Sequence, residues 1–328
     1  MSRPRLGFLG VGWIGRHRME AMLATGAVDA AAISDPSPEM VAEAQKLAPE
    51  AAVVDSFEAM LGLDLDGIVI ATPSALHAGQ SIQALEAGCA VFCQKPLGRS
   101  AAEARAVVDA ARGADRLLSV DFSYRFTAGM QRIAPMVRGG ALGHVHAVDL
   151  TFHNAYGPDK PWFYDPAQSG GGCVMDLGVH LVDLALWTLG FPEVVAVTSH
   201  LSSGGQPLTD PDRQVEDYAV ATLVLAGGTV VRLACSWRLP AGQDAVIEAS
   251  FYGTGGAAAL RNINGSFYDF RAERFEGTSR HLLTDGEDAW GGRAGADWAE
   301  RLARSRAFAE DAEELVRSAE VLDRIYGR

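Results

Sequence analysis

The chain is poor in cysteine and has no long apolar run. Four cysteines occur in 328 residues at irregular spacing, which excludes a disulfide framework and favours a reducing compartment. No window approaches the ~18 uninterrupted apolar residues that a membrane helix needs. The first ten residues carry arginines and are interrupted by Gly7 and Gly10, so they indicate a first strand rather than a signal peptide. We therefore expect a cytoplasmic protein with no membrane partner.

Positive charge is also scarce. The chain has 28 Lys+Arg against 41 Asp+Glu, a formal net charge of −13, and its basic residues form no local patch. Excess negative charge repels phosphate backbones and anionic lipid headgroups, which excludes a general nucleic-acid-binding role. Only three of the basic residues are lysines, Lys46, Lys95 and Lys160, so each is a candidate for a role that arginine cannot fill.

The first part of the chain alternates apolar runs with Ala-rich stretches of helical spacing. Continuous apolar strands that alternate with helices predict a parallel sheet covered on both faces and built from right-handed βαβ units. We expect a doubly wound α/β domain over residues 1–123. Its strand candidates are Leu6–Leu9, Val28–Ile33, Gly67–Ala71, Ala90–Cys93 and Leu117–Val120.

The rhythm changes after about Phe126. Strand-like runs follow one another on short Gly-containing turns, which predicts an open, mainly antiparallel sheet in an α+β domain over residues 124–328. One helix near Asp176–Leu189 interrupts the strands, and Asp297–Tyr326 closes the chain as helix. The strand candidates are His144–Phe152, Val194–Leu201, Tyr218–Leu225, Thr229–Trp237, Ala245–Tyr252 and Ala257–Ile263.

A GxGxxG motif follows the first predicted strand and opens a helix. Glycines there allow a tight turn and close approach of a pyrophosphate, which the free N–H groups at the helix start bind. Asp35 lies 20 residues after the last glycine, where an acidic side chain takes the ribose hydroxyls. The alternative is a glycine turn followed by an Asp that caps the next helix. A carboxylate at Asp35 repels a 2′-phosphate and favours NAD, while the nearby Arg16 keeps NADP open. The candidate cofactor residues of the turn are Gly10, Gly12, Trp13, Ile14 and Gly15.

Two further strands end in polar residues. Ligands bind beyond the carboxyl ends of parallel strands, so both ends are expected to face the cofactor. Proline restricts the residue before it to extended geometry, which aims Lys95 off the strand tip, where its ammonium can donate to a substrate hydroxyl or carbonyl. The alternatives are a surface ion pair for Lys95 and a capping or solvent-facing role for His77. The candidate residues at the two ends are Thr72, Pro73, Ser74, His77, Gln94 and Lys95.

The densest cluster of candidate residues follows three glycines, Gly170–Gly172. Asp176 and His180 come four residues apart on one face of the predicted helix. Such a pair suits a general base, because the carboxylate holds the imidazole tautomer while the other ring nitrogen exchanges a proton. The alternative is a helix ion pair or a core histidine. His144 and His146 share a strand face, but no third ligand with metal-type spacing accompanies them, so we expect no metal site.

Together these segments resemble the Gfo/Idh/MocA oxidoreductase family, named for glucose–fructose oxidoreductase, inositol dehydrogenase and a rhizopine-catabolism protein. The resemblance covers most of the chain, and the segment that begins with three glycines is its most specific part. The family commonly has Glu before the lysine, whereas position 94 is Gln here, which removes a charge next to Lys95. The matching segments are Gly10–Gly15, Thr72–Ser74 with His77, Lys95-Pro96, Tyr124–Phe126 and Gly170–Asp183.

The resemblance implies a Rossmann domain joined to an open antiparallel sheet domain, with the active site in the cleft between them. It implies that Lys95, Asp176 and His180 form the catalytic group and that Trp162 lies near the nicotinamide. A cis peptide at Lys95-Pro96 is also expected. The outer face of the second domain's sheet is expected to form homodimers or homotetramers.

The function expected is hydride transfer between nicotinamide and a hydroxyl or ketone of a sugar, cyclitol or related polyol. His180 removes the hydroxyl proton, Asp176 orients His180, and Lys95 hydrogen-bonds the reacting oxygen. Two alternatives stay open: an NAD-dependent glycosidase that oxidises its sugar transiently, and a non-catalytic NAD-binding sensor.

Substrate contacts are expected from the second domain as well. Arg125 has an alternative as a domain-junction ion pair, and Phe275–Trp298 has two interpretations, as an exposed loop or as a lid. The shape of the aromatic-rich loop Asn154–Gln168 cannot be read from one sequence. The substrate-facing candidates are Lys95, Tyr124, Arg125, Asn154, Tyr156, Trp162, Asp176, His180 and Asp183.

Overall fold

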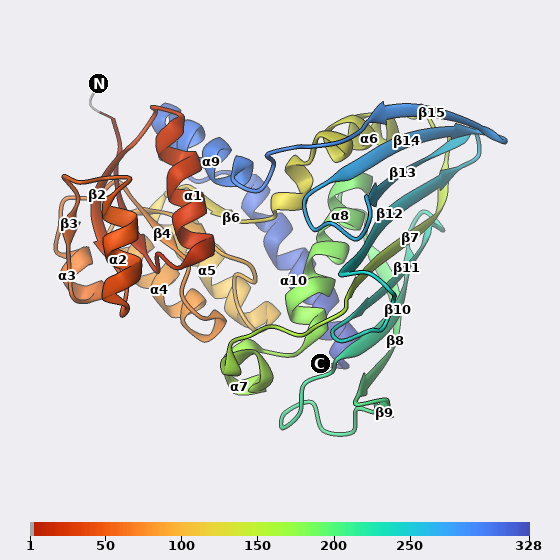
Figure 1. Ribbon diagram of the computed structural model, residues 1–328, viewed down its shortest axis with the longest axis horizontal. Coiled ribbons are helices and arrows are strands. Elements are labelled where there is room, and N and C mark those ends of the chain that lie inside the picture. Colours follow the sequence, from red (N-terminus) through yellow and green to blue (C-terminus); the bar gives the residue numbers. More distant parts are fainter. Residues whose placement is uncertain (1–2) are drawn as a thin grey trace. The chain divides into compact units, whose positions relative to one another are not determined.

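The structure is a computed structural model that describes residues 3–328 of the chain. The chain divides into two compact units (Figure 1). Unit 1 contains the chain up to Ser123 together with Gly291–Val316, and unit 2 contains Tyr124–Trp290 and Arg317–Arg328. Residues 291–316, which the sequence pattern assigns to the second domain, thus cluster with the first unit.

Unit 1 is built on a parallel sheet of six strands in the order β3-β2-β1-β4-β5-β6. The central strands are buried along their length, which explains why they read as continuous apolar runs. The order reverses between β1 and β4, and in such sheets ligands bind outside the carboxyl ends of the strands at this point. The strands are β1 (Arg5–Leu9), β2 (Asp29–Ser34), β3 (Ala52–Val53), β4 (Gly67–Ile70), β5 (Ala90–Cys93) and β6 (Leu118–Val120).

Serine side chains start three of the helices of unit 1. Ser37, Ser56 and Ser100 each accept a hydrogen bond from a backbone N–H in the first turn, which satisfies donors that the helix itself leaves free. The helices are α1 (Trp13–Ala24), α2 (Pro38–Gln45), α3 (Phe57–Leu61), α4 (Ser74–Glu86), α5 (Ala101–Ala114), α9 (Arg293–Arg304) and the 3-10 turn η4 (Glu310–Ala312).

Helix α9 completes the core of unit 1 although it lies far away in sequence. Its Trp298 is fully buried, and the indole ring lies 5.8 Å from the ring of Phe92 on β5. A Cβ atom at Gly67 on β4 would come within 2.9 Å of the Trp298 ring. The glycine therefore makes room for the tryptophan, which explains why a late helix belongs to the first unit.

Unit 2 is built on a sheet of nine strands in the order β15-β14-β13-β12-β7-β11-β10-β8-β9. Neighbouring strands are antiparallel except β7 and β11, which are parallel, so the sheet is mixed but mainly antiparallel. The strands are β7 (Val145–Asn154), β8 (Val194–Ser203), β9 (Gln206–Pro207), β10 (Tyr218–Leu225), β11 (Val230–Ser236), β12 (Ala245–Gly253), β13 (Gly256–Asn262), β14 (Phe270–Glu276) and β15 (Ser279–Thr284).

One face of this sheet is covered by helices α6 and α8 (Figure 1). The strands follow this division: on β10 the buried residues Ala219, Ala221 and Leu223 alternate with more exposed ones. The helical elements of unit 2 are η1 (Ser123–Phe126), α6 (Ala128–Arg138), η2 (Pro161–Tyr164), α7 (Pro166–Ser169), η3 (Val174–Gly178), α8 (Val179–Leu189) and most of α10 (Glu313–Tyr326).

Helix α8 is apolar on nearly all sides. The span Pro166–Leu189 is long and apolar enough to cross a membrane by length and composition, but 83% of its most apolar window is buried inside the protein. It is preceded by η3, a π-helical turn, and π-turns inside helices are frequent at functional sites. The span is therefore the core helix of unit 2.

We expect removal of the Trp298 side chain to destabilise unit 1. Trp298→Ala should lower the free energy of unfolding by about 3–5 kcal/mol, because a buried aromatic ring is replaced by a cavity. Chemical denaturation of this variant and of the control Tyr268→Ala, whose ring is 54% exposed, measures the difference. Equal stabilities of the two variants would contradict the role assigned to Trp298.

Candidate active site

The glycine turn of unit 1 has the geometry of a nucleotide-binding turn. Gly10 has a φ of +82°, which favours glycine. A Cβ at Gly15 would lie 2.0 Å from the carbonyl oxygen of Gly10, whereas a Cβ at Gly12 would meet nothing within 4 Å. Two glycines therefore shape the turn, and Gly12 leaves open space. No side chain caps the start of α1, so its N–H groups are suited to an anion.

Asp35 ties the end of β2 to this turn. Its carboxylate accepts hydrogen bonds from the backbone N–H of Val11 at 2.8 Å and of Ser37 at 2.9 Å. A carboxylate can accept about four hydrogen bonds in all, so lone pairs remain for ribose hydroxyls. Trp13 is 59% and Ile14 39% exposed at the start of α1, which leaves two apolar side chains beside the turn.

The end of β4 is tied to the end of β5 through His77. Its ring is 1% exposed, and its two nitrogens lie 2.7 Å from the carbonyl oxygens of Pro96 and Thr72. A neutral imidazole donates to only one of these two oxygens, but both ring nitrogens lie against protein oxygens inside the unit. We therefore assign His77 to holding the two strand ends rather than to contacting a cofactor. The hydroxyl of Thr72 donates to Gln80 at 2.6 Å, and Ser74 is buried.

Gln94 and Lys95 follow β5, and the Lys95–Pro96 peptide bond is cis, which confirms that expectation. The Gln94 side chain is buried and donates from Nε2 to Oδ2 of Asp121 at 2.6 Å. Asp121 follows β6, so these two carboxyl ends are joined directly. The sequence motifs gave no sign of Asp121, which belongs to none of them.

In unit 2, Asp176 lies in the π-helical turn η3 and His180 in the first turn of α8. Oδ2 of Asp176 accepts a hydrogen bond from Nε1 of Trp237 at 3.0 Å. Trp237 is 3% exposed, and its ring meets the rings of Phe163 and Tyr164 edge-on. One indole therefore connects the aromatic loop to the carboxylate.

The start of this helical segment is held by a residue that sequence reasoning missed. Glu216 is fully buried, and its carboxylate accepts from the backbone N–H of Gly172 at 3.0 Å and of Val174 at 2.8 Å. The hydroxyl of Tyr326 donates to it at 2.7 Å. Burial raises the pKa of Glu216 against these hydrogen bonds. No local motif could reveal these contacts, because Glu216 is 44 residues from Gly172 and 110 residues from Tyr326.

The glycines before Asp176 allow the backbone to approach Glu216 and Tyr326 closely. A Cβ at Gly172 would lie 1.9 Å from the carbonyl oxygen of Glu216, and one at Gly171 would lie 2.0 Å from the hydroxyl of Tyr326. Gly170 has a φ of +84° and ends α7. The close backbone approach predicted for three glycines is therefore an approach of protein to protein.

Aromatic rings surround His180. Its ring centroid lies 4.9 Å from that of Tyr124 and 6.4 Å from that of Phe152. Tyr124 in turn lies 4.8 Å from Trp290. His180 is only 8% exposed, so its orientation is set by packing on several sides.

Arg125 and Asp183 form a buried two-pronged ion pair. Nε donates to Oδ2 at 2.8 Å and Nη2 to Oδ1 at 2.6 Å, and the guanidinium lies 5.6 Å from the rings of Trp187 and Phe191. Burial raises the pKa of Asp183, and the charge of Arg125 opposes that rise. The geometry favours the ion-pair interpretation of Arg125 over a substrate contact.

The remaining substrate candidates lie on the loop after β7. Tyr156 is 52% exposed, and Trp162 stacks on Phe163 with ring centroids 3.8 Å apart. Asn154 ends β7 and is partly buried. The segment Phe275–Trp298 contains a hairpin strand, a connecting stretch and the start of α9. In that stretch Trp290 is buried and donates from Nε1 to the carbonyl oxygen of Tyr268 at 2.9 Å, so it is anchored rather than exposed.

Comparison with known proteins supplies the family. Residues 5–122 match the description "Oxidoreductase family, NAD-binding Rossmann fold", and residues 130–259 match "GFO/IDH/MocA C-terminal domain". D-glucoside 3-dehydrogenase of Escherichia coli K12 is 30% identical over 262 residues, which cover 74% of this chain and 75% of the relative. Inositol 2-dehydrogenase of Rhizobium meliloti 1021 is 29% identical over 261 residues, covering 79% and 76%.

Solved structures agree with this match. The crystal structure of GenD2 from gentamicin A biosynthesis in complex with NAD has a TM-score of 0.83 at 26% identity and covers 100% of this chain and 94% of that chain. Levoglucosan dehydrogenase in complex with NADH and levoglucosan has a TM-score of 0.83 at 21% identity, covering 99% and 97%. Fold and glycine turn thus define an NAD(P)-dependent oxidoreductase with a Rossmann unit and a mixed-sheet unit. The chain belongs to the Gfo/Idh/MocA family.

We expect the burial of His77 to make stability pH-dependent. Burial lowers the pKa of His77, so the unfolded chain takes up a proton near pH 6.5 that the folded chain resists. The free energy of unfolding should therefore fall as pH drops from 7 to 5. In His77→Asn, denaturant titrations at several pH values should show a shallower fall. Its slope should not vanish, because the pKa values of His17 and His153 are also lowered. An unchanged slope would contradict this.

Proposed function

We propose that the protein is an NAD-dependent dehydrogenase of a sugar, cyclitol or related polyol. The observation that carries the proposal is that one chain contains both a dinucleotide turn closed by Asp35 and an Asp176–His180 segment held by Glu216 and Trp237. Relatives named D-glucoside 3-dehydrogenase, levoglucosan dehydrogenase and inositol 2-dehydrogenase support the substrate class.

NAD is the cofactor favoured by the ribose-binding carboxylate. Asp35 is fixed by two backbone N–H donors, and a 2′-phosphate would meet its negative charge. Arg16, the cation that could accommodate such a phosphate, lies 3.5 Å from Glu43. Both observations support NAD over NADP.

In the proposed mechanism, His180 accepts the proton of the substrate hydroxyl while the carbon gives up its hydride. Bound NAD supplies the hydride acceptor. Lys95 donates a hydrogen bond to the reacting oxygen and stabilises its developing negative charge. Asp176 orients His180, and Trp237 holds the Asp176 carboxylate in one orientation through a hydrogen bond. In the reverse direction, the proton returns to the ketone oxygen.

The decisive experiment is a screen of sugars, inositols and sugar nucleotides for reduction of NAD and NADP. Lys95→Met and His180→Gln should lower kcat by roughly 10²–10⁴-fold, because each loses a group that acts on the reacting oxygen. NAD affinity should stay unchanged in His180→Gln, because His180 lies in unit 2, outside the dinucleotide turn. Lys46→Met is the matched control, since Lys46 follows α2 and its side chain is 69% exposed. Full turnover in either site variant would remove that residue from the mechanism.

The same assay separates the alternatives. Stoichiometric accumulation of NADH with product supports a dehydrogenase. Cleavage of a glycosidic bond without net NADH supports the glycosidase, and NAD binding without turnover of any substrate supports a sensor. The four cysteines are all free thiols and buried, which agrees with action in a reducing compartment such as the cytoplasm.

We also propose that the protein forms a homodimer or homotetramer through the outer face of the unit 2 sheet. Strand register places a row of apolar side chains across seven strands of the face opposite α8. A soluble monomer seldom exposes a continuous apolar row of this extent. The row runs Phe275, Ala257, Tyr252, Ala147, Val230, Val224 and Ala196.

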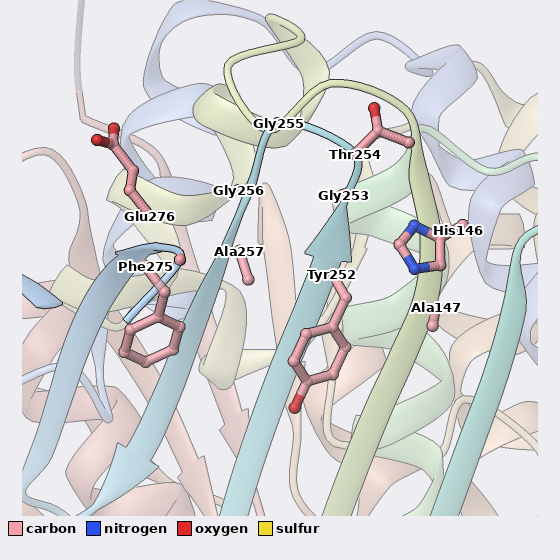
Figure 2. A pocket seen from close by; sticks show the side chains of 11 residues that line it. His146, Ala147, Tyr252, Gly253, Thr254, Gly255, Gly256, Ala257, Phe275 and Glu276 are labelled. Atoms are coloured by element: carbon pink, nitrogen blue, oxygen red, sulfur yellow. The ribbon is translucent and has the colours of Figure 1, made fainter. Parts of the chain in front are cut away.

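A hollow in this row supports contact with a second copy. It has a volume of about 680 Å³ and lies around Ala257, between the rings of Tyr252 and Phe275, with His146 and Glu276 on its sides (Figure 2). The small side chain of Ala257 leaves space between two aromatic rings. Such a space can receive a side chain of a partner molecule.

A charge placed in the row tests the oligomer. Ala147→Glu should shift the protein toward monomer in light scattering coupled to size-exclusion chromatography, because a carboxylate would be buried against apolar neighbours. Ala42→Glu on the exposed side of α2 adds the same charge elsewhere and should leave the mass unchanged. A monomeric wild type at micromolar concentration would overturn the proposal.

A further inference from the structure

Three buried polar side chains meet at the carboxyl edge of the unit 1 sheet. Asp121 follows β6, Gln94 follows β5, and Arg18 comes from α1, the helix that the glycine turn opens. Their exposed fractions are 1%, 8% and 8%. One oxygen, Oδ2 of Asp121, accepts from Nε of Arg18 at 2.6 Å and from Nε2 of Gln94 at 2.6 Å.

The charges of this cluster are matched. Arg18 carries one positive charge and Asp121 one negative charge, while Gln94 contributes a neutral donor. His17 lies beside the cluster, with its Nδ1 2.9 Å from Arg18 Nη1. Both of these hydrogen bonds to the Asp121 carboxylate go to Oδ2, and its Oδ1 is buried without a hydrogen-bond partner among the described residues. Burial and the charge of Arg18 lower the pKa of His17, so a second cation is disfavoured here.

A glutamate at position 94 would not fit this arrangement. Its carboxylate would lie where the Gln94 amide lies, 2.6 Å from Oδ2 of Asp121. Two buried carboxylates at that distance cannot both be ionised, so one would have to take up a proton. The glutamine is therefore complementary to Asp121.

We propose that Gln94 and Asp121 are a matched amide–carboxylate pair that positions Lys95. Asp121 supplies the negative charge at this sheet edge, Arg18 neutralises it, and Gln94 transmits the position of Asp121 to the adjacent Lys95. Gln94, Asp121 and Arg18 are positioning residues, since they act through Lys95. The proposal rests on the role of Lys95 in the proposed function.

The test exchanges the two groups. Gln94→Glu creates two carboxylates, Asp121→Asn leaves Arg18 without a carboxylate, and Gln94→Glu/Asp121→Asn restores one of each with their positions exchanged. We expect each single variant to lose at least tenfold in kcat at pH 8. The double variant should recover most of that loss. If the fold-losses in kcat of the two single variants multiply in the double variant, the two residues act independently and the proposed pairing is overturned.

Thermal unfolding reads the pair without any substrate. In Gln94→Glu, one of the two neighbouring carboxyl groups must be protonated in the folded state. The pKa of that group is therefore higher in the folded than in the unfolded chain. The Tm of this variant should therefore be nearest to wild type at pH 5 and fall further below it as the pH rises to 8. Gln45→Glu is the matched control, because it also adds a carboxylate directly before a lysine, on α2 at the surface. A parallel Tm profile of Gln94→Glu and Gln45→Glu would refute the pairing.

A spectroscopic readout reports on Lys95 itself. The chain has three lysines, so ¹³C-dimethylated protein gives few lysine signals, and Lys95→Met assigns that of Lys95. The Lys95 signal should move in Gln94→Glu and return toward its wild-type position in the double variant. The signals of Lys46 and Lys160 should stay fixed. An unmoved Lys95 signal would refute the positioning role even if no substrate were turned over, whereas failure of the substrate screen alone would count only against the proposed function.

Discussion

The buried carboxylate of Glu216 fixes the segment that carries Asp176 and His180. Moving a charge out of water costs several kcal/mol unless other groups replace its hydration. Here the replacement comes from two backbone N–H groups at the start of a helical segment and from one tyrosine hydroxyl. All three donors are neutral, and they reach the carboxylate only while the segment is in place. The glycine run, the π-turn and the end of α10 are thereby constrained together.

This constraint explains the glycines before Asp176, which the proposed reaction itself would not require. Gly171 and Gly172 are glycines because any Cβ there would meet Tyr326 or the backbone of Glu216. Trp237, which directly follows strand β11, then holds Asp176 through a hydrogen bond. The catalytic candidates of unit 2 are two side chains, Asp176 and His180, but their segment is held by Glu216, Trp237 and Tyr326, which are distant in sequence.

Sequence patterns predicted the parts of the molecule that local chemistry determines. The glycine turn, Asp35 and the strand ends at Thr72 and Lys95 lie where strand periodicity and spacing placed them. What the sequence could not supply were partners that come together only on folding. Asp121 and Glu216 are single acidic residues among 41, and only the folded chain brings them to Gln94 and Gly172. Helix α9 joins unit 1 for the same reason, since Gly67 is shaped for a tryptophan 231 residues later.

Two buried carboxylates, both outside every motif, are compensated in opposite ways. Asp121 faces a permanent cation, Arg18, and an amide, so its partners remain charged or polar at any pH at which the protein is folded. Glu216 faces only neutral donors, and burial raises its pKa. A raised pKa means that its ionised form costs stability as the pH rises from the unfolded value toward the folded one. The hydrogen bonds of the Glu216 carboxylate that carry this cost in stability also fix the backbone of the segment with Asp176 and His180. Asp121 is compensated by an ion pair in unit 1. Glu216 has only neutral donors, so its burial costs some stability while its hydrogen bonds fix the geometry of the segment in unit 2.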